Sequence, residues 1–270
     1  MSLFGLAVSA EALTRFAIFA AALAALVMAE TLWPALTRHF PRFRRWPTNV
    51  LLTLADTAML RLLFPLLAVG TAVWAEAAHF GLFNRIAVPG WAAFAASLLV
   101  LDVVIYAQHV AMHRVGLLWR FHRVHHTDRD VDVTTAVRFH PGEIALSMGL
   151  KMAIVALLGA PPASVIAFEA ILNGMAMFNH ANLKLPAALE RVLRWLVVTP
   201  DMHRIHHSLL RAEMDTNYGF NLSLWDRLFR TYRRAASRPD FTLGLEHFQS
   251  AAPNGWGFVF ALPFLGGPAR

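Results

Sequence analysis

Residues 121–128 read FHRVHHTD, and residues 202–209 repeat the same spacing of histidines, H-x-x-H-H, in MHRIHHSL. With 13 histidines in 270 residues, random placement gives roughly 0.03 copies of the pattern, so two copies are not chance. Positions i, i+3 and i+4 lie on one face of a helix, where three imidazoles can converge on a single point. Each stretch therefore predicts a helix that presents candidate metal ligands. The six histidines of the two stretches are His122, His125, His126, His203, His206 and His207.

The composition predicts a membrane protein. Hydrophobic residues make up 57% of the chain and charged residues 15%, with a mean hydropathy of +0.49, which is too apolar for an ordinary soluble domain. The sequence has no cysteine, which excludes disulfides, iron–sulfur clusters and thiol catalysis, so metal ligands must be histidine or carboxylate. The net charge of +7 comes with arginines clustered between apolar runs. This pattern indicates anionic lipid headgroups rather than nucleic acid as the partner.

Long apolar runs predict four to five membrane-spanning helices in an all-α bundle. The first is expected to be a retained helix rather than a signal peptide, and the last two form a hairpin around the GAPP of residues 159–162. The arginine-rich loop 38–47 follows the first helix, and the positive-inside rule places that loop on the cytoplasmic side. Counting the spans from there brings every histidine cluster to the cytoplasmic ends of the helices. The runs cover residues 16–33, 50–74, 91–106 and 144–177.

After residue 180 the chain is mixed in polarity and rich in arginine. It predicts a helical cap on the cytoplasmic membrane surface, with amphipathic helices near residues 187–198 and 218–233. The whole chain is therefore expected to divide into three parts. These are N-terminal membrane helices (1–97), a histidine-rich region (98–233) and a C-terminal tail (234–270).

Three further histidines extend the candidate site. His109 and His113 are four residues apart at the end of the third span, and Tyr106 and Asp102 continue the same helical face backwards. A carboxylate inside a membrane helix needs a partner, so Asp102 is expected to accept the free N–H of a ligating imidazole. His180, in FNHANL, ends the hairpin on the same side of the membrane.

Nine histidines are too many for one ion, which takes four to six ligands, and suit a site for two ions. Imidazole ligands suit zinc, copper, nickel and iron, so the residue type alone does not identify the metal. A tenth candidate is His140, in RFHPGE, which either is a further ligand or makes a hydrogen bond within a loop before the hairpin. The nine are His109, His113, His122, His125, His126, His180, His203, His206 and His207.

The ordered motifs HVAMH, HRVHH and HRIHH, with RFHPGE, NHANL, NYG and WDRLF between or after them, resemble the superfamily of fatty acid hydroxylases and sterol desaturases. The resemblance covers about residues 98–233 and implies a helical membrane scaffold that carries two non-haem irons on the nine histidines. It also implies that O₂ and two electrons are used to hydroxylate or desaturate a lipid C–H bond. Two residues depart from the family pattern. Val110 stands where arginine is common, and Arg230 replaces the glycine that is common after WDRLF.

Two other functions remain open from the residues. A zinc-dependent membrane hydrolase would need a general-base glutamate inside a histidine motif, and no motif here contains one. A non-enzymatic metal-binding or transport protein would have ligands along a path through the bilayer rather than at one face. The expected function is O₂-dependent oxidation of a membrane lipid such as a fatty acyl chain, a sterol or a carotenoid. The family favours hydroxylation over desaturation.

Reduction of O₂ needs electrons, and no haem, flavin or ferredoxin segment is visible in the sequence. The expected partner is a separate donor, a ferredoxin or a cytochrome b5-like protein with its reductase. It would dock on the arginine-rich cytoplasmic face through an acidic surface. In a bacterium the protein would lie in the inner membrane.

Overall fold

Helices form every regular element of the computed structural model, which describes residues 10–237 and 241–266. Residues 238–240 and 267–270 of the predicted tail lie outside the described residues. The all-α fold is as predicted. The α-helices are α1 (Ala10–Leu32), α2 (Arg42–Leu63), α3 (Ala68–Ala77), α4 (Gly90–Arg114), α5 (Gly116–His126), α6 (Pro141–Leu158), α7 (Pro162–His180), α8 (Ala187–Leu193), α9 (Pro200–His206), α10 (Arg211–Met214), α11 (Leu224–Leu228) and α12 (Trp256–Ala261).

Three segments among the described residues are long and apolar enough to cross a membrane: Arg42–Asn84, Gly90–Arg114 and Pro141–Leu158. α1 adds a shorter apolar stretch, Phe19–Leu32. Only 11% of the apolar window in the first segment and 17% of that in the third is buried inside the molecule. Most of these apolar side chains therefore face outward, where a lipid environment would cover them. The protein is a membrane protein, as its composition predicted.

The second predicted span, residues 50–74, is two helices rather than one. α2 ends at Leu63, and α3 begins at Ala68. Pro65 explains the break, because proline lacks an amide hydrogen and disfavours helical geometry at the residue before it. Phe64 accordingly has an extended backbone (φ −122°, ψ 101°).

The predicted helical hairpin is present as α6 and α7, joined at the GAPP turn. Gly159 ends α6 in the left-handed conformation (φ 61°), and Pro162 begins α7 at its first position. The turn packs closely on the loop between α3 and α4, where a Cβ on Gly81 would lie 2.2 Å from the backbone nitrogen of Gly159. Both glycines are therefore required by the close approach of two backbones.

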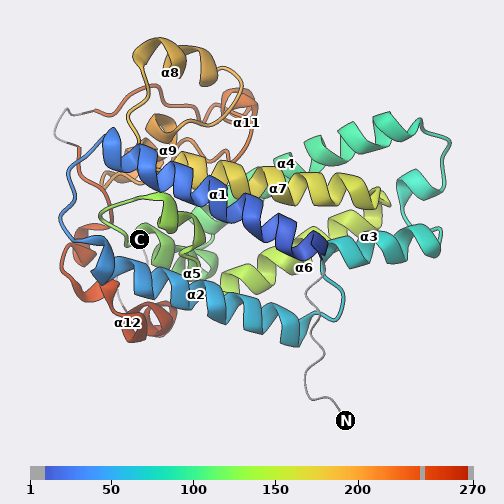
Figure 1. Ribbon diagram of the computed structural model, residues 1–270, viewed down its shortest axis with the longest axis horizontal. Helices are drawn as coiled ribbons and strands as arrows, with labels where there is room; N and C mark the ends of the chain where they lie inside the picture. The colour runs from blue at the N-terminus through green and yellow to red at the C-terminus, as the bar shows by residue number, and fades with distance from the viewer. Residues whose placement is uncertain (1–9, 238–240, 267–270) are drawn as a thin grey trace.

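The long helices lie side by side along the long axis of the molecule (Figure 1). α7 packs against α1, α3 and α4, and α6 packs against α2 and α3. One end of the bundle brings together the C-terminal ends of α1, α4 and α7 and the N-terminal ends of α2 and α6 (Figure 1). α5 and the short helices α8 to α12 lie at the same end. This end holds all nine histidines of the predicted site.

The end of the molecule formed by α8 to α11 contains less helix than the sequence predicted. α8 stops at Leu193, and within residues 218–233 only Leu224–Leu228 is α-helical. Asn217 (φ 52°) and Arg230 (φ 61°) flank that short helix in the left-handed conformation. A right-handed helix cannot continue through such residues.

Residues 241–266, most of the predicted tail, pack against the bundle. Val259 and Leu262 join Leu52 of α2 and Val124 of α5 in one apolar cluster. The guanidinium of Arg123, on α5, donates a hydrogen bond to the Leu262 carbonyl at 2.7 Å. The segment therefore supports the helix that carries the first H-x-x-H-H motif.

A buried ionic network ties α2 to the turn that follows α5. Arg45 is fully buried, and its guanidinium donates to Asp128 at 2.6 Å and to Asp132 at 2.8 Å. Arg138, also buried, donates to Asn49 of α2 and to the Pro253 carbonyl. Buried charges are tolerated only when paired and hydrogen-bonded, so these contacts fix the relative positions of the segments that they join.

Candidate metal centre

Four helices supply the nine histidines. α4 carries His109 and His113, α5 carries the first H-x-x-H-H motif, and α7 ends at His180. α9 carries His203 and His206 of the second motif, and His207 follows its last residue. Thr199 caps its start through a hydroxyl that accepts a hydrogen bond from the Met202 amide at 3.3 Å, and proline is its first residue. Both motifs are helical, as their spacing predicted.

The nine imidazoles form two groups in which the candidate ligand atoms lie within 4.8 Å of one another. Neighbours in the sequence separate: His125 and His126 belong to different groups, and so do His206 and His207. The reason is that successive side chains on a helix point about 100° apart. The group of five is His109, His113, His122, His126 and His206, and the group of four is His125, His180, His203 and His207.

Outward hydrogen bonds fix which nitrogen of several rings faces the centre of its group. His109 Nδ1 lies 2.7 Å from the Tyr218 carbonyl, and His206 Nδ1 lies 2.9 Å from the Thr216 carbonyl. His122 Nδ1 lies 2.7 Å from Glu143 Oε1, and His180 Nδ1 lies 2.6 Å from the carbonyl one turn earlier in α7. A carbonyl or carboxylate oxygen can only accept, so Nδ1 carries the hydrogen in all four rings and Nε2 carries the lone pair.

These lone pairs face one another without a hydrogen between them. His109 Nε2 lies 3.1 Å from His122 Nε2, although both nitrogens are acceptors. His206 Nε2 is buried and has no hydrogen-bond partner among the described residues. Buried acceptors in this arrangement are costly, and a cation between them removes the cost. The donor set therefore fits a metal ion in the group of five.

The Nε2 atoms of the group of four also converge. His180 Nε2 lies 3.1 Å from His125 Nε2 and 2.9 Å from His203 Nε2, and His203 Nε2 lies 3.3 Å from His207 Nε2. Four imidazoles whose Nε2 atoms converge can fill the tetrahedral shell of one metal ion. Together the two groups fit two ions, which is the number that the count of histidines predicted.

The surroundings keep five of the imidazoles neutral. Burial away from water lowers the pKa of these five, which lie outside the membrane segments, well below 6.5, and the neighbouring imidazoles lower it further. A neutral imidazole has the lone pair that a metal ion needs. The residues concerned are His125, His126, His203, His206 and His207.

The role predicted for Asp102 is wrong. Its carboxylate accepts from the Asn221 amide at 2.9 Å and from the Trp225 indole at 2.7 Å, and no imidazole of the described residues donates to it. Glu143 instead receives the N–H of an imidazole, that of His122. The helical spacing gave the correct face for Asp102, but the loop that covers this face comes from a distant part of the sequence.

His140 is the one predicted ligand that the structure does not bring into either group. Its Nδ1 accepts a hydrogen bond from the Gly142 amide at 3.0 Å and so caps the start of α6. Its Nε2 lies 3.3 Å from the Phe260 carbonyl. The geometry corresponds to the second reading of this residue, a hydrogen-bonded histidine in the loop before the hairpin.

The NYG motif builds part of the support for the site. Asn217 has a left-handed backbone, and its side chain donates to the Met202 carbonyl and accepts from the Arg233 amide. The next two amides, of Tyr218 and Gly219, both donate at 2.8 Å to the carboxylate of Asp226 in the WDRLF motif. This loop presents the Tyr218 carbonyl to His109, a role that the sequence alone did not reveal.

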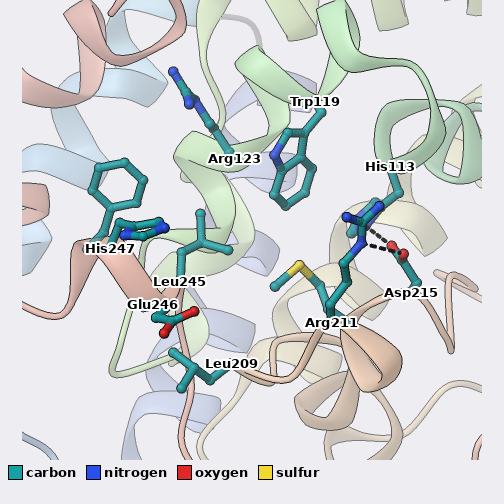
Figure 2. A pocket seen from close by; sticks show the side chains of 11 residues that line it. His113, Trp119, Arg123, Leu209, Arg211, Asp215, Leu245, Glu246 and His247 are labelled. Atoms are coloured by element: carbon teal, nitrogen blue, oxygen red, sulfur yellow. Dashed lines mark hydrogen bonds and ion pairs between the residues drawn. The ribbon is translucent and has the colours of Figure 1, made fainter. Parts of the chain in front are cut away.

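Two cavities reach the group of five from different directions. One, of about 480 Å³, lies among α1, α2, α4, α6 and α7 and touches His109 and His122. The other, of about 290 Å³, is lined by residues of α5, α10 and the segment near residues 245–248, and it touches His113. Figure 2 shows Asp215 in this second cavity between His113 and Arg211, at 3.4 Å from each. The candidate site is thus accessible both from within the bundle and from the end formed by the short helices.

Comparisons with known proteins agree with the motifs. An ornithine lipid hydroxylase of Rhizobium tropici is 32% identical over 145 residues, which are 54% of this chain and 43% of that protein. An alkylglycerol monooxygenase of Danio rerio is 32% identical over 177 residues, covering 65% of this chain and 36% of that protein. A cholesterol 25-hydroxylase of Rattus norvegicus is 24% identical over 152 residues, which are 55% of this chain and 49% of that protein.

The chain spans less than half the length of each of these relatives. No solved structure gives a significant match. Residues 94–231 match the family described as fatty acid hydroxylase, and these residues are just over half of the chain. They include all nine clustered histidines and the loop that supports them. The protein therefore belongs to the fatty acid hydroxylase family.

Proposed function

We propose that this protein is an O₂-dependent hydroxylase that oxidises a C–H bond of a membrane lipid at a centre of two iron ions. The observation that carries the proposal is the pair of adjoining histidine groups, of which the group of five borders a cavity among apolar helices through His109 and His122. A lipid can enter such a cavity from the bilayer. The names of the relatives, hydroxylases and a monooxygenase of lipids, favour hydroxylation over desaturation.

The nine histidines would hold the ions, five around one and four around the other. Bound iron supplies the redox chemistry that an unactivated C–H bond requires, because no side chain is basic enough to remove such a hydrogen. In the reaction one oxygen atom of O₂ enters the C–H bond and the other leaves as water. Two electrons and two protons are consumed, and they must come from outside the chain.

The chain itself positions the ligands and the substrate. Glu143 and the Tyr218 and Thr216 carbonyls hold three imidazoles in the orientation that directs Nε2 to the centre. The apolar walls of the larger cavity, among them Ile105, Met148 and Leu172, would hold a lipid chain and keep water from it.

We further propose that the histidine end faces the cytoplasm and receives electrons from a separate soluble donor. The arginine-rich loop at the start of α2 supports this orientation. Exposed arginines surround the same end and suit a donor with an acidic surface. They include Arg114, Arg191, Arg211, Arg230 and Arg234.

A zinc-dependent hydrolase is less well supported. Neither histidine group includes a carboxylate among the described residues. Glu143, a candidate base, is engaged with the outer nitrogen of His122 rather than directed to the centre. A hydrolase would need a carboxylate near its metal-bound water.

The test is comparative lipid analysis of membranes with the wild-type protein and with His203→Ala, each incubated under ¹⁸O₂. We expect a lipid product that carries one ¹⁸O atom and is absent with His203→Ala. The matched control is His79→Asn, because His79 is exposed just after α3 and belongs to neither group, and asparagine tolerates its left-handed backbone, so this variant should keep the product. A product that forms equally without O₂, or that persists with His203→Ala, contradicts the proposal.

A further inference from the structure

A third cavity, of about 350 Å³, is lined by none of the nine clustered histidines. The loop between α1 and α2, which lines it, lies at the histidine end of the bundle (Figure 1). Thr37, His39 and Thr242 of the lining are exposed, so the cavity opens to the outside. The three segments that form most of the lining are residues 36–39, 129–131 and 241–243.

Two arginines of this lining have donors that the fold does not use. The Nε atoms of Arg38 and Arg129 are buried and have no hydrogen-bond partner among the described residues. A buried N–H group without an acceptor costs roughly 1 to 3 kcal/mol. Arg38 belongs to the loop before α2 and Arg129 to the turn after α5, so the same deficit occurs on two separate segments around one cavity.

The same arginines have few acidic partners. The guanidinium of Arg129 donates to the Gln249 carbonyl and lies 5.8 Å from the centre of the Phe40 ring, and both of these partners are neutral. Arg38 shares the carboxylate of Glu30 with Arg42, at 3.3 Å and 2.6 Å respectively. One carboxylate therefore serves two guanidinium groups, and positive charge remains beside the cavity.

The side-chain acceptors of the lining are already engaged. The Asp130 carboxylate accepts from the His39 amide at 2.7 Å, from the His39 ring at 3.0 Å and from the Phe40 amide at 2.8 Å. The side chain of Asn182 exchanges two hydrogen bonds with the backbone of Leu36. An occupant of the cavity therefore meets free donors rather than free acceptors.

Free donors beside guanidinium groups are the features of a site for an anion. Thr37 and Thr242 add hydroxyl groups at the mouth of the cavity that can also donate. The donors belong to three segments and approach from several directions, which suits the oxygens of a phosphate group better than the two coplanar oxygens of a carboxylate. We propose that this cavity binds a phosphate group. The site is separate from the histidine groups, and the proposal does not depend on the proposed function.

The phosphate can come from a phospholipid head group or from soluble phosphate. Leu32 and Trp33 are exposed apolar residues directly before the loop that lines the cavity. A lipid with its phosphate in the cavity would have its chains beside this apolar surface. Basic pockets at the membrane surface bind phospholipid head groups in this way.

The test uses the purified full-length protein in dodecyl maltoside, a detergent without phosphate. The ionic strength is about 0.1 M, where charges more than about 10 Å apart are screened. The probes are dioleoyl phosphatidic acid, dioleoylglycerol (the same lipid without phosphate) and inorganic phosphate. Native mass spectrometry measures the binding of the two lipids, and isothermal titration calorimetry measures that of inorganic phosphate. We expect phosphatidic acid to bind at least about tenfold more tightly than dioleoylglycerol, which is the contribution of one charge-assisted hydrogen bond.

Arg38→Gln and Arg129→Gln each remove one donor and one charge from the lining. Each should weaken the binding of phosphatidic acid by at least about tenfold. The matched control is Arg44→Gln, because Arg44 is exposed in the first turn of α2 and does not line the cavity. It removes the same charge and should stay within about twofold of the wild-type affinity.

Two outcomes support the site and identify its source of phosphate. Tighter binding of phosphatidic acid than of inorganic phosphate assigns the site to a lipid head group. Equal binding of the two, with displacement of the lipid by inorganic phosphate, assigns it to soluble phosphate. A wild-type protein that binds neither phosphate probe more tightly than dioleoylglycerol overturns the proposal, whether or not the variants fold. An equal loss of affinity in Arg44→Gln and in a folded Arg129→Gln overturns it as well.

Discussion

Glu143 Oε1 lies 2.7 Å from His122 Nδ1, so a carboxylate in the first turn of α6 orients an imidazole on α5. Partners of this kind contribute about 10- to 100-fold to metal affinity when the imidazole is a ligand. We expect Glu143→Ala to weaken metal retention by that factor, measured by competition with a chelator. Glu143→Gln keeps an acceptor oxygen and should lose less. Glu76→Ala, which removes an exposed carboxylate on α3, should change nothing.

The division of the histidines into five and four predicts close to two metal ions per chain in protein purified without chelator. His206→Ala removes a ligand from the group of five and His125→Ala removes one from the group of four. Each should lower the metal content by up to one ion, measured by elemental analysis against protein concentration. A content of one ion that neither change affects would disprove the two-ion centre.

Acid should destabilise the protein once its metal is removed. The imidazoles of His203 and His207 have a pKa well below 6.5 in the folded chain because they are buried, whereas the unfolded chain has a value near 6.5. Below about pH 6.5 the unfolded chain therefore binds more protons, and stability falls as pH falls, by up to about 1.4 kcal/mol per pH unit for each imidazole.

The melting temperature of chelator-treated protein should accordingly fall between about pH 7 and about pH 5. Replacing both His203 and His207 by asparagine should make the fall shallower. His247→Asn changes an exposed residue and should leave the slope as it is. A melting temperature independent of pH over this range would contradict the prediction.

Arg230 occupies a left-handed position (φ 61°) at the place where the family commonly has glycine. A side chain costs about 1 kcal/mol in this conformation, and glycine avoids the cost. Arg230→Gly should raise the melting temperature in detergent by about 2 °C. Arg230→Ala removes the same charge but keeps Cβ, so it should not be stabilising. If both variants have the same melting temperature, the loss of the charge and not the backbone conformation explains the change.

Docking of an acidic electron donor would make turnover depend on salt. We expect the KM for the donor to rise with ionic strength around 0.1 M, where charges more than about 10 Å apart become screened. Arg191→Gln/Arg234→Gln should raise the KM at low salt with little change in kcat. Arg85→Gln is the control, because Arg85 is exposed in the loop between α3 and α4, and this loop lies at the opposite end of the bundle from α8 to α12 (Figure 1). A KM independent of salt would argue against an acidic donor.

The spacing of the histidines was sufficient to predict their helices and their convergence. The sequence could not assign each histidine to its group, because that depends on how α4, α5, α7 and α9 cross. The sequence also did not reveal which residues hold the elements of the site in place. Asp102 was correctly placed on the inward face of α4, yet its partners, Asn221 and Trp225, lie about 120 residues further along the chain.

The helix predicted for residues 218–233 is shorter in the structure because contacts between residues distant along this segment set its backbone. Its apolar and charged residues alternate as in an amphipathic helix, but Asn217 and Arg230 adopt left-handed conformations that no periodicity expresses. The amide of Arg233 bonds to Asn217 Oδ1, and the carboxylate of Asp226 holds two amides of the NYG loop. Tertiary hydrogen bonds therefore determine the backbone conformation of residues 218–233, although the local sequence pattern predicts a helix there.

The ionic network around Arg45 limits how far the chain can be shortened. Residues 94–231, the part that matches the family, contain Asp128, Asp132 and Arg138. Arg45, which donates to both aspartates, and Asn49 and Pro253, which accept from Arg138, lie outside that range. A fragment with those boundaries would leave buried charges unpaired, at a cost of about 3 to 5 kcal/mol for each broken pair. The part of the chain that matches the family model is therefore shorter than the part that pairs these buried charges.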